Sequence, residues 1–394
     1  MSTVDKPRSF AVWPLAVAQT LSWASIYYVF PALLPEWESE LGWTRAFLSS
    51  AFTATLLVSA SSAPLIGILI DRGYSKAVMV GSAVLGAICL LGLSMAAQPW
   101  QFLLWWALMG LAQAGALYEA CFAVITRAVG AEAKRAITLV TLVGGFAGTL
   151  SFPTAHALAT TLGWRAALVC FAGVMVVSAI ITATALRRVI TKPAQATEHM
   201  RGHQALLRHI RRPMFWLLAL AAVMISLNHA TIITHLLPLL ADRELGRNTA
   251  ILAAAMIGPM QITGRLAMMA AGDRSSAITV SIASFLAMAL ASAALLATAV
   301  QFELVVAFVL LQGAGYGVTS ITRPVIIGEC FGHQHYGTLA GALAFPLTTA
   351  AALAPILGAL VWSLGGYNLM LAFTLSAALI GCICMLVVRR INSC

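Results

Sequence analysis

Three ionisable side chains stand inside otherwise apolar stretches of this sequence: Glu119, Arg265 and Arg323. Each lies eight or nine residues before the polar end of its stretch. At about 1.5 Å per helical residue, all three lie roughly 12 Å from that end. An ionised group at membrane depth costs at least about 2.5–3.5 kcal/mol, so it is usually retained where it serves a function. Their shared depth makes these residues the first candidates for chemistry.

The stretches that hold these charges are long enough to be transmembrane helices. Of the 394 residues, 61% are hydrophobic and only 9% are charged, against about 25% charged residues in soluble domains. We predict an all-α polytopic membrane protein with twelve transmembrane helices in two six-helix bundles related by pseudo-two-fold symmetry, since each crossing needs about 20 apolar residues. The predicted spans are 10–34, 46–70, 77–97, 102–126, 135–160, 166–186, 214–240, 249–271, 277–299, 304–328, 337–362 and 368–388.

The net charge of +10 is distributed unevenly along the chain. Of the 23 lysines and arginines, seventeen fall in segments predicted to be cytoplasmic, four in outer loops, and two inside spans. Since cytoplasmic loops of membrane proteins carry excess positive charge, we predict that both termini are cytoplasmic, in a multi-pass protein of the cell's inner (plasma) membrane. The basic surplus thus indicates topology and contact with anionic lipid, and no nucleic-acid partner is predicted.

The chain divides at a polar, basic segment, residues 189–212, which we interpret as a cytoplasmic linker. It separates an N-terminal six-helix bundle, residues 1–188, from a C-terminal six-helix bundle, residues 213–394. Three pairs of landmarks repeat at one offset of 202 residues: Asp71 with Asp273, Gly130 with Gly332, and Leu162 with Leu364. The shared offset indicates an internal duplication, and two similar bundles suit alternating access to a central site.

A charged motif closes the second predicted span, and part of it repeats after the eighth. The first copy consists of Gly67, Asp71, Arg72 and Lys76, and the second keeps Asp273 and Arg274. The motif resembles the loop between helices 2 and 3 of the major facilitator superfamily, G-x-x-x-D-[RK]-x-G-[RK]-[RK]. The resemblance implies twelve helices, with helices 1, 4, 7 and 10 around a central cavity. It also implies that the charges of the motif hold one conformation through contacts between helices.

Within that superfamily the chain is loosely similar to the monocarboxylate porter and oxalate/formate antiporter branch. The similarity rests on Phe30-Pro31, Lys134-Arg135 and Gly264-Arg265-Leu266. Porters of that branch commonly carry an Asp-x-x-x-Arg pair in helix 8, where this chain has Gln261 before Arg265. They also have a lysine just after Phe-Pro in helix 1, where this chain has Ala32. These two departures weaken the case for lactate-like proton symport.

The candidate substrate and proton-coupling residues are the intramembrane charges and the polar side chains of several spans. Besides Glu119, Arg265 and Arg323 they are Tyr118, Tyr27, Tyr28, Gln19, Asn228, His229, Gln261 and Gln312. The two arginines carry two positive charges, and Glu119 supplies only one negative charge. The difference favours an anionic substrate group that accepts two hydrogen bonds from one guanidinium. His229 could titrate near neutrality in a proton relay, or it could hold a hydrogen bond between helices.

Glu119 admits several roles. It could carry a proton, pair with an arginine, contact a cationic group of the substrate, or form a local pair with Arg127 two turns later. Two glycine patterns predict close packing of helices through small residues, and the second also permits bending of the helix. They are Gly144 with Gly148 in the fifth span, and Gly313, Gly315 and Gly317 in the tenth.

We predict a secondary active transporter that moves a small organic solute, by preference an organic anion, through alternating access with proton coupling or exchange. The alternative is proton-driven efflux of a drug or other toxic compound. An intramembrane enzyme and a membrane receptor represent other classes, but the sequence has no ATP-binding loop and no recognisable catalytic set. Its cysteines and histidines lack metal-site spacing. We therefore expect no enzyme activity, no metal and no cofactor, in a monomer whose partners are the solute, protons and the lipid bilayer.

Overall fold

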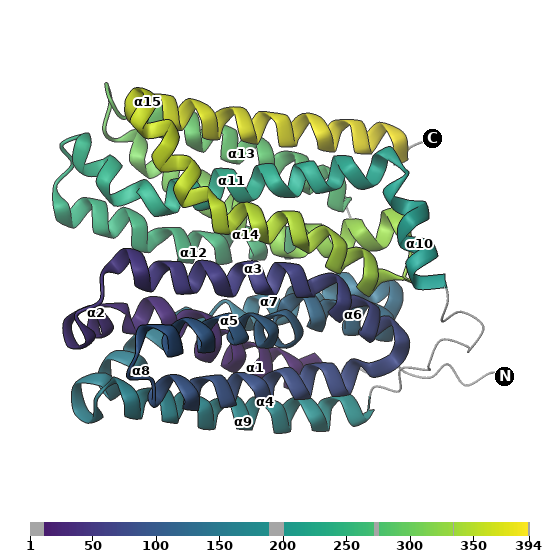
Figure 1. Cartoon of the computed structure of the whole chain (residues 1–394). Coiled ribbons are helices and arrows are strands. Elements are labelled where there is room, and N and C mark those ends of the chain that lie inside the picture. The colour runs from purple at the N-terminus through teal and green to yellow at the C-terminus, as the bar shows by residue number, and fades with distance from the viewer. Residues whose placement is uncertain (1–11, 189–200, 272–275, 334, 393–394) are drawn as a thin grey trace. The chain divides into compact units, whose positions relative to one another are not determined.

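The structure, a computed structural model, describes residues 12–188, 201–271, 276–333 and 335–392, and every regular element in these parts is helical (Figure 1). The first half of the chain contains α1 (Val12–Trp23), η2 (Ala24–Tyr28), α2 (Val29–Leu41), α3 (Arg45–Leu69), η3 (Ile70–Tyr74), α4 (Ser75–Ser94), α5 (Pro99–Ala116), α6 (Tyr118–Val129), η4 (Gly130–Glu132), α7 (Ala133–Gly144), α8 (Ala147–Leu162) and α9 (Trp164–Arg188). The second half contains α10 (Arg201–Ile210), α11 (Pro213–Asp242), α12 (Arg247–Ala271), α13 (Ala277–Ala297), α14 (Leu304–Phe331) and α15 (Tyr336–Asn392). Segments η2 and η3 are π-helical turns, and η4 is a short 3-10 turn.

Ten helical segments among the described residues are long and apolar enough to cross a membrane. Eight of them hold 21–31 residues, whereas Arg45–Ser94 holds 50 and Tyr336–Asn392 holds 57. Each long segment contains glycine with a non-helical backbone, at Gly73 in the first and at Gly365 and Gly366 in the second. Since one crossing needs about 20 residues, each long segment has the length for two. The described chain is all-α, as predicted.

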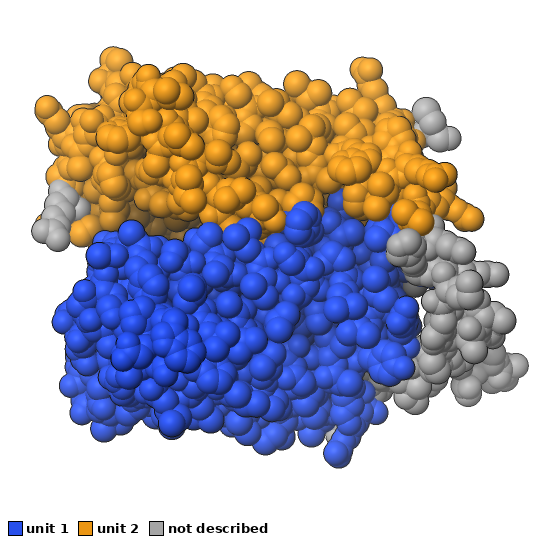
Figure 2. All heavy atoms as spheres, viewed as in Figure 1, with its two compact units in different colours: residues 1–206, 331–345 blue, residues 207–330, 346–394 orange. Residues whose placement is uncertain are grey.

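The described residues form two compact units, coloured separately in Figure 2. Unit 1 comprises residues 1–206 and 331–345, and unit 2 comprises residues 207–330 and 346–394. The beginning of α15 therefore belongs to unit 1, although it follows α14 of unit 2 along the chain. The predicted linker lies partly outside the described residues, and the predicted bundle boundaries stay a prediction.

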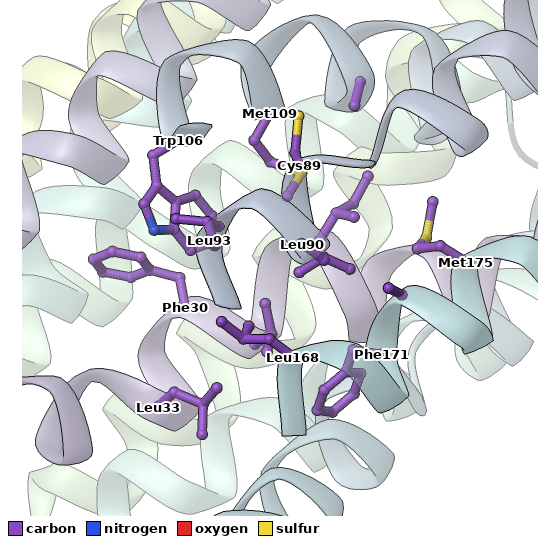
Figure 3. Packing of buried hydrophobic residues seen from close by; sticks show 14 of the residues in the cluster. Phe30, Leu33, Cys89, Leu90, Leu93, Trp106, Met109, Leu168, Phe171 and Met175 are labelled. Atoms are coloured by element: carbon purple, nitrogen blue, oxygen red, sulfur yellow. The ribbon is translucent and has the colours of Figure 1, made fainter. Parts of the chain in front are cut away.

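Unit 1 is held together by apolar packing among its long helices. Helix α4 packs along both α5 and α9, α3 packs along α5, and α1 lies against α7 and α9. Figure 3 shows the interior of this packing, to which α2, α4, α5 and α9 contribute Phe30, Leu90, Trp106 and Phe171. These four side chains are at most 5% exposed. Because lipid tails are as apolar as these side chains, close van der Waals packing rather than removal from water holds the surrounding helices together here.

In unit 2, the backbones of helices α12 and α14 approach each other closely at Gly264 and Gly317, which we call the glycine seam. A Cβ atom at Gly264 would overlap the backbone of Ala314, and one at Gly317 would overlap the backbone of Gln261. The two backbones can approach this closely because these positions lack side chains, in the small-residue packing that was predicted for the tenth span. The seam fixes the place of α12, and hence of Arg265, relative to α14.

Gly317→Ala is expected to destabilise unit 2, because the added methyl group would force α12 and α14 apart. Overpacking of this kind costs about 1–3 kcal/mol, which should lower the Tm measured by thermal unfolding in detergent. Gly258→Ala is the control, since Gly258 lies on α12, the partner helix of Gly317, but its added Cβ would meet no heavy atom within 4 Å. Equal Tm values for the two variants would contradict the proposed role of the seam.

Candidate functional site

The helix that carries Glu119 is interrupted two residues before it. Helix α5 ends at Ala116, Leu117 has an extended backbone (φ −91°, ψ −168°), and α6 begins at Tyr118. Gln19 of α1 donates from Nε2 to the Ala116 carbonyl at 2.7 Å, so a side chain satisfies this carbonyl at the end of α5. Glu119 consequently lies in the first turn of α6, where the helix dipole favours a negative charge.

Two further interruptions lie in neighbouring helices of unit 1. The π-helical turn η2 separates α1 from α2, and a turn at residues 145–146 separates α7 from α8. Gln113 of α5 donates to the Ile26 carbonyl at 2.6 Å, and Ser151 of α8 donates to the Ala24 carbonyl at 2.8 Å. Irregular backbone at membrane depth is tolerated where protein groups satisfy it in this way. Side chains of α5 and α8 therefore hold η2 in place.

Aromatic rings gather at these interruptions. The Trp23 ring centroid lies 4.9 Å from that of Tyr27 and 4.8 Å from that of Tyr118, and Tyr28 lies 5.3 Å from Tyr27. All four rings are partly exposed, and Glu119 follows Tyr118 directly. The structure thus brings together the three predicted tyrosines. Trp23 was not predicted, and its signal in the sequence is the four-residue spacing from Tyr27, which puts both rings on one helix face.

Arg265 of α12 and Arg323 of α14 belong to a second group of side chains, in unit 2. Arg265 is 8% exposed and donates from Nε to the Gly317 carbonyl at 3.0 Å. Both guanidinium groups are close enough to Tyr316 to interact electrostatically with its phenol. The His229 ring stacks on Tyr316, with ring centroids 3.4 Å apart. We refer to Arg265, Arg323, Tyr316 and His229 as the arginine cluster.

Asn228 and Gln312 form a buried hydrogen-bond network beside the arginine cluster. Gln312 Nε2 lies 3.1 Å from Asn228 Oδ1 and 3.3 Å from His229 Nδ1. Asn228 Nδ2 donates to Ser292 Oγ at 3.0 Å and to the Thr374 carbonyl at 2.9 Å. The network joins α11, α13, α14 and α15, and both amide side chains are 0% exposed. Such burial is typical of residues that position others, here the His229 ring.

The structure gives two residues of unit 2, Gln261 and Tyr316, a place that the sequence did not predict. The backbone of Gln261 lies against Gly317, so this residue belongs to the glycine seam, and its side chain is partly buried. Tyr316 was not predicted, although it lies at the centre of the arginine cluster. Tyr316 lies between Gly315 and Gly317 in the sequence, and these glycines indicate only that another helix packs closely there.

The charged motif after the second predicted span is built around Asp71. Its carboxylate accepts hydrogen bonds from Gly337 N at 3.0 Å, Thr338 N at 2.6 Å and Thr338 Oγ1 at 2.7 Å. Asp71 therefore caps the N-terminus of α15, and Arg127 Nη1 lies 3.7 Å from the carboxylate. Gly67 permits this contact, since a Cβ atom there would overlap the backbone of Gly337.

The other members of the motif are placed differently. Arg72 and Lys76 are exposed. The predicted second copy, Asp273 and Arg274, lies outside the described residues. Arg127 also donates to the Ile70 carbonyl at 2.6 Å, which holds its guanidinium at the opposite end of α6 from Glu119.

Asp71→Asn is expected to lower the Tm of the protein, because an amide can accept only part of the bonds that the buried carboxylate receives. Removing one partner from a buried hydrogen-bonded group costs about 1–3 kcal/mol. Thr338→Val should give a smaller decrease, since it removes only the hydroxyl bond. Lys76→Gln, an exposed change in the same motif, is the control. If Asp71→Asn unfolds at the same temperature as this control, the cap contributes nothing to stability.

A family model described as the Major Facilitator Superfamily matches residues 15–272 of the chain. The chain belongs to the major facilitator superfamily. No curated protein sequence matches it. Among solved structures, that of the human organic anion transporter MFSD10 (TETRAN) is similar at 13% identity and a TM-score of 0.75, over 95% of this chain and 98% of that one.

Two further solved structures are similar in the same way. The superfamily transporter FucP, in its outward conformation, shares 15% identity with a TM-score of 0.72, over 95% of this chain and 97% of its own. The proton:xylose symporter XylE, bound to 6-bromo-6-deoxy-D-glucose, shares 13% identity with a TM-score of 0.71, over 96% of this chain and 95% of its own. At such identities the likeness shows the fold alone.

Membership of the superfamily confirms the predicted family and identifies a multi-pass membrane protein that transports small molecules and is not an enzyme. The similarity to the monocarboxylate porter and oxalate/formate antiporter branch stays a prediction. So do the roles of the candidate residues, whose geometry supports the proposals below.

Proposed function

We propose that this superfamily member is a secondary active transporter of a small organic anion, working by alternating access with proton coupling or exchange. The arginine cluster carries the proposal. Within the described helices α11–α15, Asp242 and Glu329 are the only acidic residues, and both lie at helix ends. Arg265 and Arg323 therefore bring positive charge to the interior of unit 2.

The chemistry of the arginine cluster suits a carboxylate. A guanidinium group is planar, is always charged, and can donate two parallel hydrogen bonds to both oxygens of one carboxylate. The bond from Arg265 Nε to the Gly317 carbonyl restricts the orientation of that side chain. Because hydrogen bonds are electrostatically stronger in a low-dielectric interior than in water, a partly buried pair of arginines can hold an anion that has left its hydration shell.

In unit 1 we propose that Glu119 couples transport to protons. Carboxylates at membrane depth commonly serve as proton relays in transporters. The other described acidic residues of unit 1 lie at helix ends or in the charged motif: Glu36, Glu38, Glu40, Asp71 and Glu132. Glu119 is set apart from them by its place in the first turn of α6, directly after the helix interruption at Leu117 and the Tyr118 ring position.

We also propose twelve membrane crossings in two six-helix bundles. Dividing the two long segments at Gly73 and at Gly365–Gly366 turns the ten candidate segments into twelve. The excess of positive charge in alternate loops supports cytoplasmic termini and an inner (plasma) membrane location. On this proposal the protein works as a monomer, since both bundles come from one chain.

Flux measurements in proteoliposomes test the proposed function. A panel of radiolabelled organic anions, cations and neutral solutes is presented outside, with an imposed pH gradient or with unlabelled solute inside. We expect uptake of at least one anion, driven by the gradient or by exchange. Saturable transport of cations or neutral solutes without any anion would contradict the proposal.

The alternative is proton-driven efflux of a cationic drug or toxic compound, and one observation favours it. Trp23 and Tyr118 lie in contact, Glu119 follows Tyr118 directly in the sequence, and aromatic faces attract cations by about 0.5–2 kcal/mol. A carboxylate next to such rings could exchange a proton for the cation. Inverted vesicles that accumulate a cationic dye on acidification, in a manner that Glu119→Gln removes, would support efflux over anion transport.

A further inference from the structure

The helix interruptions of unit 1 have one location in common. Leu117 between α5 and α6, the π-helical turn η2, and the turn at residues 145–146 are linked by side chains of the neighbouring helices. A π-helical turn is often found at a functional site, and broken backbone in a membrane is tolerated where protein or a water-filled cavity surrounds it. Leu117 leaves the helical region of φ/ψ at this point, and η2 and the turn at residues 145–146, whose backbone angles stay helical, lie beside it.

The side chains at that point are Trp23, Tyr27, Tyr28 and Tyr118, which we call the ring cluster. Trp23 contacts each of the tyrosines, with ring centroids 4.9, 6.2 and 4.8 Å away in chain order. The interplanar angles of these pairs are 45–60°, so the rings do not form one flat stack. A ring of a ligand placed against them would meet faces and edges together, the arrangements that aromatic pairs prefer.

One glycine makes room for the ring cluster. A Cβ atom at Gly144 of α7 would overlap the Tyr118 hydroxyl, whereas one at Gly148 of α8 would make an ordinary contact at 3.5 Å from the Tyr28 ring. Gly144, whose spacing from Gly148 predicted close helix packing, therefore makes room for a tyrosine side chain. This seating holds the Tyr118 ring in a fixed position before any ligand arrives, which lowers the entropy cost of binding.

The ring cluster differs from the aromatic core of the same unit. Phe30, Trp37, Phe102 and Trp106 pack in that core and are at most 5% exposed. The four rings of the cluster remain partly exposed, and three of them carry hydroxyl groups. Complete burial accounts for the core aromatics, whereas the rings of the cluster keep partial exposure although Tyr118 also stacks on Phe122 at 5.0 Å.

We propose that the ring cluster binds a flat ring of the transported solute. This proposal rests on the proposed anion transport, and it narrows the substrate class to aromatic carboxylates. Trp23 and Tyr118 are specificity-determining residues that favour an aromatic ring over an aliphatic group of the same size.

Binding to the purified full-length protein in detergent at pH 7 tests the proposal, with benzoate, cyclohexanecarboxylate and propionate as probes. Affinities come from the increase in Tm with ligand concentration. Since an aromatic pair is worth about 0.5–1.5 kcal/mol beyond buried area, benzoate should bind about 2- to 10-fold tighter than cyclohexanecarboxylate. Trp23→Leu should remove this preference, whereas Trp23→Phe should keep most of it. Trp13→Leu, an exposed change on the same helix, should leave it intact.

A second pair of variants leaves every ring in the protein. Gly144→Ala displaces the Tyr118 hydroxyl and should weaken benzoate binding more than propionate binding. Gly173→Ala is the matched control, because its added Cβ would meet no heavy atom within 4 Å. A wild type that binds benzoate and cyclohexanecarboxylate equally, or a Trp23→Leu variant that keeps the preference, would overturn the ring proposal alone. If no carboxylate binds, or if Arg323→Gln binds all three as the wild type does, the proposed anion transport fails as well.

Discussion

Arg323→Gln is expected to raise the KM for saturable uptake of organic anions into proteoliposomes by about 30-fold or more. The substitution keeps a polar side chain of similar length but removes the charge and the two-pronged donor that a carboxylate requires. Truncating one partner of a buried charge pair costs about 2–5 kcal/mol, or roughly 30- to 5,000-fold in affinity. Because Arg323 is only partly buried, we expect the effect near the lower end of that range. The measurement is the initial rate of uptake as a function of anion concentration.

Two further variants separate charge from geometry. Arg323→Lys keeps the charge as a point source and should recover part of the affinity, since lysine cannot bind both carboxylate oxygens in one plane. Arg389→Gln changes an exposed arginine at the end of α15 and should transport like the wild type. An Arg323→Gln variant with unchanged kcat/KM for the anion would remove Arg323 from the binding site.

The depth of the charged residues could be predicted from the sequence, and their surroundings could not. Counting residues to the helix end placed Arg265 and Arg323 at one level, and the structure groups both around Tyr316. Tyr316 escaped notice because its partners come from three helices. Its stacking on His229 depends on how α11 and α14 pack, which no local pattern encodes.

The helix interruptions were also beyond the reach of sequence patterns. Leu117 lies in an apolar run with neither proline nor a charged residue at the break, so periodicity predicts a continuous helix through residues 102–126. The extended backbone at Leu117 is compensated by Gln19, which is distant in the sequence. Gly144 shows the same limit in another way, since a glycine spacing signals close approach but does not say whether a backbone or a tyrosine ring fills the space.

Glu119→Gln is expected to abolish accumulation driven by a pH gradient while leaving exchange of solute for solute intact. Glutamine has nearly the shape of the protonated glutamic acid but cannot release a proton, so a carrier with this change should still rearrange with bound solute. A gradient of one pH unit, about 1.4 kcal/mol, can accumulate an electroneutrally coupled solute about tenfold, and the variant should approach a ratio of one. Accumulation and counterflow are measured in the same proteoliposome preparation.

The pattern of the two rates distinguishes the roles that Glu119 could have. A residue that only positions Tyr118 at the start of α6 should slow accumulation and counterflow together when changed, because both need bound solute. A proton carrier should lose accumulation alone. Glu132→Gln, an exposed change in η4, controls for loss of a carboxylate elsewhere in unit 1 and should preserve both rates. Full pH-driven accumulation by Glu119→Gln would exclude this residue as the proton carrier, and coupling would then have to be sought among the histidines, beginning with His229.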